Sequence, residues 1–61
     1  MNGKKVISTL ENKGWKILRS HGSHYRLGKG SLRVTVPVHG SKELGKGLLA
    51  AIERQTGVKL S

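Results

Sequence analysis

The chain has 61 residues, with twelve Lys and Arg against three Asp and Glu, which gives a formal net charge of +9 at pH 7. This length allows one domain at most, residues 1–61, and the lack of cysteine excludes disulfide bonds and thiolate metal sites. We find no run of signal-peptide length and none near the roughly 20 apolar residues of a membrane span, so we expect no membrane partner and a cytoplasmic protein. The basic surplus favours an acidic partner, either a nucleic acid or an acidic protein.

The first predicted element is a helix from about residue 4 to residue 13. Asn2 can cap its start, and Gly14 follows as the left-handed residue that commonly comes after a helix end. The apolar residues of this segment recur on one side, as expected for an amphipathic helix that covers a core. They are Val6, Ile7 and Leu10.

Three short strands are predicted next, at residues 15–19, 23–27 and 32–36. The third alternates cleanly between apolar and polar residues, whereas Leu18 breaks the alternation of the first. Gly22 and the stretch 28–30 should form tight turns. Short turns make the strands an antiparallel meander.

A second helix is predicted over residues 46–56, after a loop at 38–42 and a turn at 43–45. Gly57 should end it, and Leu48, Leu49 and Ile52 should form its buried face. The fold class is therefore α+β, in the order α-β-β-β-α. Two amphipathic helices can cover only one face of a three-stranded antiparallel sheet.

Alternation along the strands predicts which side chains lie on the uncovered face. If the apolar residues of the second and third strands face the helices, this face is basic and carries one group of a type that titrates near neutral pH. Trp15 and Tyr25 could stack on nucleic-acid bases, but we interpret both as core residues. The predicted side chains of the uncovered face are His24, Arg26, Arg33 and Thr35.

Short motifs spread over nearly the whole chain allow a comparison with a known family. They are Lys13-Gly14-Trp15, Arg19 followed by Gly22-Ser23-His24, Val34-Thr35-Val36-Pro37, and Lys42-Glu43-Leu44 before a helix ending in Gln55-Thr56-Gly57. As a set, they resemble the HicA family of toxins from bacterial and archaeal toxin–antitoxin pairs. The resemblance implies a double-stranded-RNA-binding-domain-like fold, an mRNA endoribonuclease activity and a HicB-like antitoxin as partner. It assigns the catalytic histidine to His24.

RNA cleavage requires few catalytic groups from a protein, because the 2′-hydroxyl of RNA is itself the nucleophile. A neutral imidazole at His24 could take the 2′ proton as a general base. Arg26, Lys29 or Arg33 could stabilise the negative charge on the phosphate. Ser23 could bind a phosphate oxygen or orient the imidazole. This account needs no metal ion or other cofactor, and three scattered acids are too few for a Mg²⁺ site.

The residues also allow other interpretations. His24 could be an ordinary exposed strand histidine in a non-catalytic RNA-binding module, or the basic surface could serve mainly to dock an acidic protein. We interpret His21 and His39 as loop residues rather than catalysts. A zinc site made of the three histidines would match no standard ligand spacing.

Overall fold

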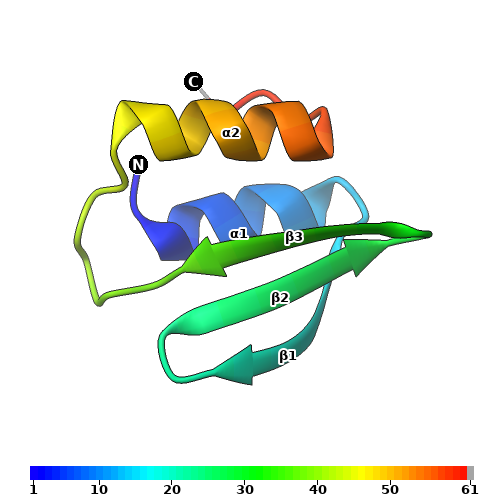
Figure 1. The fold of residues 1–61 in the computed structure, drawn as a ribbon, viewed down its shortest axis with the longest axis horizontal. Coiled ribbons are helices and arrows are strands. Elements are labelled where there is room, and N and C mark those ends of the chain that lie inside the picture. The colour runs from blue at the N-terminus through cyan, green and yellow to red at the C-terminus, as the bar shows by residue number, and fades with distance from the viewer. Residues whose placement is uncertain (61) are drawn as a thin grey trace.

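The computed structural model describes residues 1–60, and its elements follow the predicted order (Figure 1). They are α1 (Gly3–Asn12), β1 (Lys16–His21), β2 (His24–Lys29), β3 (Leu32–Pro37) and α2 (Lys46–Thr56). The strands form one antiparallel sheet in the order β1-β2-β3, and both helices lie on the same face of it. This arrangement confirms the α+β class. Among the described residues, no helix has the length and apolar character needed to cross a membrane.

Helix α1 begins at the predicted cap. The Asn2 side-chain oxygen accepts a 2.9 Å hydrogen bond from the Lys5 N–H, which satisfies one of the free donors of the first turn. Gly14 follows the helix with a φ of +94°, in the positive-φ conformation expected after a helix end. The helix starts and ends one residue earlier than predicted. Its buried residues are Gly3, Val6, Ile7 and Leu10.

Both hairpins turn through a two-residue Gly-Ser loop. Gly22 has a φ of +61° and Gly30 a φ of +58°, which is the left-handed conformation that a type II′ turn requires at its first central position. The second strand therefore continues to Lys29, two residues beyond its predicted end. Gly28, predicted as part of the turn, instead pairs with Arg33 inside the ladder.

A β-bulge at Leu18 accounts for the broken alternation of the first strand. Ile17 pairs with Leu27, and the register then shifts so that Arg19 pairs with Arg26. The extra residue of a bulge changes which side chains follow on each face. As a result, Arg19 lies on the same face of the sheet as Arg26, although strict alternation from Ile17 would place it on the opposite face.

The core lies between the helices and the sheet. Trp15 is 2% exposed and Tyr25 is half-buried against the core, as their assignment to the core predicted. Val58 and Leu60, which follow α2, are also buried, and the Leu60 N–H donates a 2.6 Å hydrogen bond to the Glu53 carboxylate. The remaining buried apolar residues are Val6, Ile7, Leu10, Leu27, Val34, Val36 and Ile52.

Two residues predicted to face the core are exposed. Leu48 is 39% exposed, because α2 packs through the face that Leu49 and Ile52 share, and Leu48 lies about 100° from Leu49 around the helix. Leu32 is 50% exposed because it is the first residue of β3, beside a turn that projects past both helices (Figure 1).

Candidate active site

The sheet face opposite the helices, which we call the open face, carries the basic and hydroxyl side chains. Register places its residues in three cross-strand rows. The rows are His21–His24–Pro37, Arg19–Arg26–Thr35 and Lys16–Gly28–Arg33. His24, Arg26, Arg33 and Thr35 are all exposed, as predicted from the alternation.

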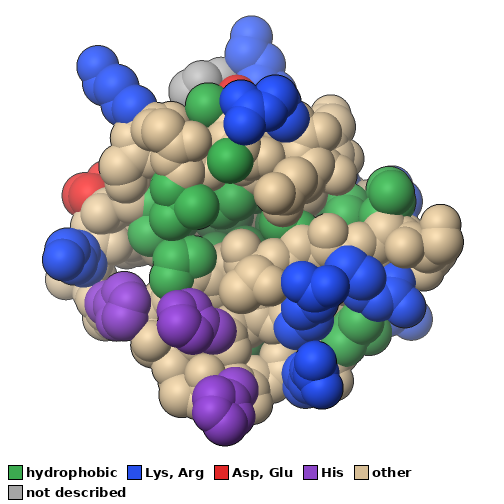
Figure 2. Space-filling model, viewed as in Figure 1, with side chains coloured by type: hydrophobic (Ala, Val, Ile, Leu, Met, Phe, Trp, Pro, Cys, Tyr) green, Lys and Arg blue, Asp and Glu red, His purple; other side chains and the backbone are tan. Residues whose placement is uncertain are grey.

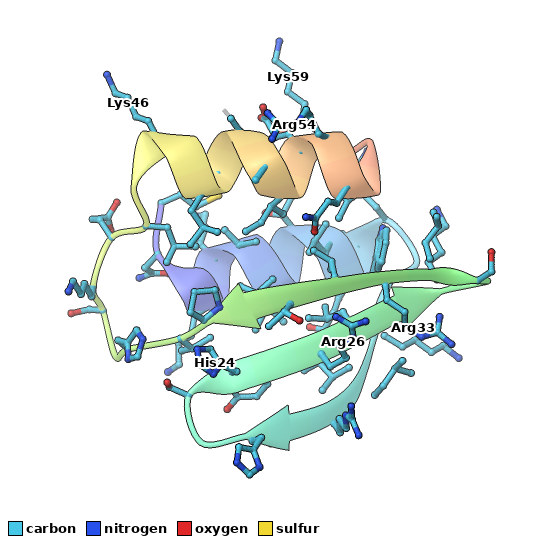
Figure 3. All side chains as sticks on the ribbon, in the orientation of Figure 1. His24, Arg26, Arg33, Lys46, Arg54 and Lys59 are labelled. Carbon is cyan, nitrogen blue, oxygen red and sulfur yellow. The ribbon has the colours of Figure 1, made fainter. Side chains whose placement is uncertain are left out.

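The open face has a histidine end and an arginine end. Figure 2 shows histidine side chains gathered at one end of the sheet and Lys and Arg side chains at the other. His24 begins β2, and Arg26 follows two residues later on the same face, about 6.8 Å further along the strand. Arg33 projects from β3 beyond Arg26 (Figure 3). The imidazole and the guanidinium groups therefore line one continuous surface.

His39, in the loop between β3 and α2, lies beside His24. The two ring centroids are 6.4 Å apart and the ring planes meet edge to face at 82°. The Val38 N–H donates a 2.7 Å hydrogen bond to the Ser23 carbonyl, so the residues directly before the two histidines are joined. The Lys42 N–H donates to the His39 carbonyl at 3.0 Å and closes the loop. The backbone therefore holds two exposed imidazoles next to each other.

The Arg26 guanidinium is held in place on the open face. Its Nη1 donates a 2.9 Å hydrogen bond to Thr35 Oγ1 on the neighbouring strand. On its other side, Arg19 is its direct cross-strand partner. Among residues 1–60, the one ion pair joins the N-terminal amino group to Glu43, so neither arginine has a carboxylate partner there. Two adjacent like charges cost stability, and they create a positive region suited to an anion.

The side chains of Arg33 and Leu18 lie over the Gly28 backbone. Arg33 Nη1 donates to the carbonyls of Gly30 at 2.9 Å and Leu32 at 2.7 Å. A Cβ atom at Gly28 would lie 2.7 Å from Leu18 Cδ1 and 2.9 Å from Arg33 Nη1. The glycine therefore leaves the space that both side chains occupy, and the apolar Leu18 side chain extends the open face beside a cation.

The other two predicted site residues are placed differently. Ser23 is half-buried in the β1–β2 turn, directly before His24. Lys29 lies on the helix side of the sheet, where its Nζ donates a 2.7 Å hydrogen bond to the Lys13 carbonyl after α1. Its contact with RNA stays a prediction, but the structure does not bring it to the open face with the predicted arginines.

Arg19 and His39, which lie beside the predicted residues Arg26 and His24, were missed by reasoning from the sequence. Arg19 reaches the open face through the bulge at Leu18, whose broken alternation was the available signal. His39 approaches from a loop, where no periodic pattern indicates direction. In addition, His21 is not a loop residue as interpreted: it ends β1 and pairs with His24. Within residues 1–60, no three His, Asp or Glu side chains are grouped closely enough to hold a metal ion.

Comparisons with known proteins identify the family of this chain. The family model described as HicA toxin of bacterial toxin–antitoxin systems matches residues 3–58, which include every residue of the open face. A curated protein from Pseudomonas fluorescens (strain Pf0-1), named probable mRNA interferase HicA, is 34% identical over 50 residues, which cover 82% of this chain and 83% of that protein. No solved structure matches at a significant level. The chain belongs to the HicA family of toxins of bacterial toxin–antitoxin systems.

Proposed function

We propose that this protein is the toxin of a type II toxin–antitoxin pair and an endoribonuclease that cleaves mRNA in the cytoplasm without a metal ion. The observation that carries the proposal is the exposed His24 imidazole, on a sheet face whose arginines have no carboxylate partner among residues 1–60. Membership of the HicA family supports the toxin role. The name of the Pseudomonas relative, mRNA interferase, supports an mRNA substrate.

His24 acts as the general base in this mechanism. RNA supplies the nucleophile, because its 2′-oxygen can attack the adjacent phosphorus once its proton is removed. An exposed imidazole can accept that proton from an RNA strand that crosses the sheet, and a positioned base contributes about 10²–10⁴-fold. The new bond joins the 2′-oxygen to phosphorus, and the bond from phosphorus to the 5′-oxygen breaks. The products carry a 2′,3′-cyclic phosphate and a 5′-hydroxyl.

The arginines bind the phosphates and stabilise the charge of the transition state. Arg26 uses Nη1 to bind Thr35, and guanidinium has five N–H donors, so others remain for phosphate oxygens. A guanidinium that is already held in place needs little reorganisation when charge develops on the phosphate. Arg19 and Arg33 extend the same positive surface on either side. Arginine also matches phosphate geometry with two parallel hydrogen bonds.

We also propose that a HicB-like antitoxin inhibits the enzyme by covering the open face. A surplus of nine positive charges attracts an acidic protein surface as well as RNA. An antitoxin seated there would block His24, so antitoxin and RNA should compete. Adding purified HicB-like antitoxin should release bound RNA and stop cleavage. A ternary complex that still cleaves RNA would contradict this mode of inhibition.

The test of the proposed function compares two substrates in the presence of EDTA. Wild-type protein is incubated with a random-sequence RNA pool and with the matching DNA pool, and the ends of the products are identified. We expect the RNA alone to be cut, with 2′,3′-cyclic phosphate and 5′-hydroxyl ends. Cleavage that stops in EDTA, or that extends to DNA, would contradict the mechanism. Salt-dependent RNA binding without cleavage would identify the alternative, a non-catalytic RNA-binding module.

A further inference from the structure

We propose that His39 is a second catalytic histidine, which donates a proton to the 5′-oxygen as this oxygen leaves. This inference rests on the proposed function and extends it, because His24 accounts for only one of the two proton transfers. When the bond between phosphorus and the 5′-oxygen breaks, the departing oxygen carries negative charge. Protonation of that oxygen in the transition state removes the charge.

The geometry of the histidine pair fits this role. The rings of His24 and His39 have centroids 6.4 Å apart, and both side chains are exposed. Two rings at this separation can each place a nitrogen about 2.8 Å from an oxygen of the same phosphate. The 82° angle between the ring planes keeps the rings from stacking face to face. Their nitrogen atoms can therefore approach one phosphate from two directions.

The backbone fixes this pair more firmly than a loop position alone would suggest. The hydrogen bond from the Val38 N–H to the Ser23 carbonyl joins the chain directly before each histidine. The Lys42 N–H holds the His39 carbonyl from the other side of the loop. Pre-organisation of this kind matters because a catalytic group must stand within hydrogen-bond reach of the reacting atom.

The reaction requires a second group at this place. The attacking and leaving oxygens lie roughly in line across the phosphorus, so one imidazole cannot contact both at the same moment. His24 gains the 2′ proton and becomes an imidazolium, while His39 starts as an imidazolium and becomes neutral. Exchange of protons with water then restores both rings. No oxidant or other reactant is consumed.

Other side chains near His24 fit the role less well. Tyr25 is half-buried and packs against the core on the helix side. His21 is the cross-strand partner of His24, but among residues 1–60 the ring pair formed at this end joins His24 to His39. Arginine guanidinium groups are effectively always charged in proteins, so they are poor proton donors. His39 is therefore the residue that the structure assigns as the acid.

The test replaces the leaving oxygen with sulfur. A synthetic RNA carries, at a cleavage site mapped with the wild-type enzyme, a sulfur atom in place of the bridging 5′-oxygen. A thiol has a pKa of about 8.5, far below that of an alcohol, so the sulfur leaves without protonation. His39→Ala should cleave ordinary RNA about 10²–10⁴-fold more slowly than wild type, and should recover most of that loss on the sulfur substrate. His24→Ala should stay slow on both.

His39→Gln is measured in parallel, because glutamine keeps a polar side chain in the loop but cannot supply an imidazolium proton. Lys46→Ala serves as the control, because Lys46 lies on α2 away from the open face, and it should keep the wild-type rate. The inference is overturned if His39→Ala and His39→Gln cleave ordinary RNA at the wild-type rate, which leaves the role of His24 intact. Equal losses on both substrates, or an equal loss for Lys46→Ala, overturn it as well. Failure of the wild-type enzyme to cut RNA overturns the proposed function itself.

Discussion

The backbone N–H of Val38 donates a 2.7 Å hydrogen bond to the carbonyl of Ser23. This contact continues the pairing of β2 with β3 by one step beyond the last pair, His24 with Pro37. As a consequence, the loop that carries His39 leaves the sheet directly beside His24. Main-chain pairing thus brings the two imidazoles of the site close together.

Hydrogen exchange can test this extension of the ladder. The Val38 amide should exchange with solvent deuterium more slowly than the Gly40 amide in the same loop, because opening it requires breaking the hydrogen bond to Ser23. Residue-resolved exchange measured by NMR provides the comparison. Equal exchange at the two amides would show that the loop is not held against the β1–β2 turn.

Loss of Arg26 should weaken RNA binding in a salt-dependent way. For single-stranded nucleic acid, each phosphate contact adds about 0.7 to the slope of log affinity against log salt, so Arg26→Ala should lower that slope by about this amount. Lys46→Ala is the matched control, since it removes one positive charge from α2, away from the open face (Figure 3). Filter-binding titrations over a range of salt give both slopes. Equal slopes for the two variants would contradict a specific role for the open face.

Arg19→Gln should have opposite effects on stability and on RNA binding. Arg19 and Arg26 are direct cross-strand partners with like charge, and removing such a repulsion is worth about 0.2–1 kcal/mol. We therefore expect a higher free energy of unfolding in urea, together with weaker RNA binding. A variant that is less stable and binds RNA as tightly as wild type would show that this pair has no role in recognition.

Gly3→Ala should destabilise the fold at the base of the His39 loop. A Cβ atom at Gly3 would collide with the Pro37 carbonyl oxygen and would lie 2.9 Å from Val38 Cγ2. Overpacking of this kind costs about 1–3 kcal/mol. Gly47→Ala in α2 is the control, because nothing lies within 4 Å of its Cβ position and alanine favours a helix by about 0.5–1 kcal/mol.

Urea unfolding of both glycine variants gives the comparison. Gly3→Ala should unfold at a lower urea concentration than wild type, and Gly47→Ala at the same or a higher one. A Gly3→Ala variant as stable as Gly47→Ala would contradict the close packing of α1 against the end of β3.

Most of the fold followed from periodic patterns in the sequence. Alternation in β3 and the apolar stripe of α1 each specify one buried face, so the layers and the open face were predictable. The ends of the strands were less predictable than the layers, because Gly28 and Gly30 are both compatible with a turn. The side-chain positions of Leu18 and Arg33 explain why glycine stands at 28, and no local pattern contains that information.

The candidate site was predictable only in part. His24 and Arg26 came from alternation and from a family resemblance, and the structure places both on the open face. Arg19 was missed because a one-residue bulge reverses the facing of all later residues in a strand. His39 was missed because its position depends on one long-range backbone hydrogen bond, and neither composition nor spacing predicts such a bond.

The most direct test of the account is the rate at which His24→Ala cleaves RNA in the presence of EDTA. The circular dichroism spectrum and the RNA affinity of this variant should match those of the wild-type protein, because the His24 side chain is exposed. We predict a cleavage rate lower by about 10²–10⁴-fold. Cleavage by His24→Ala at the wild-type rate would contradict the account.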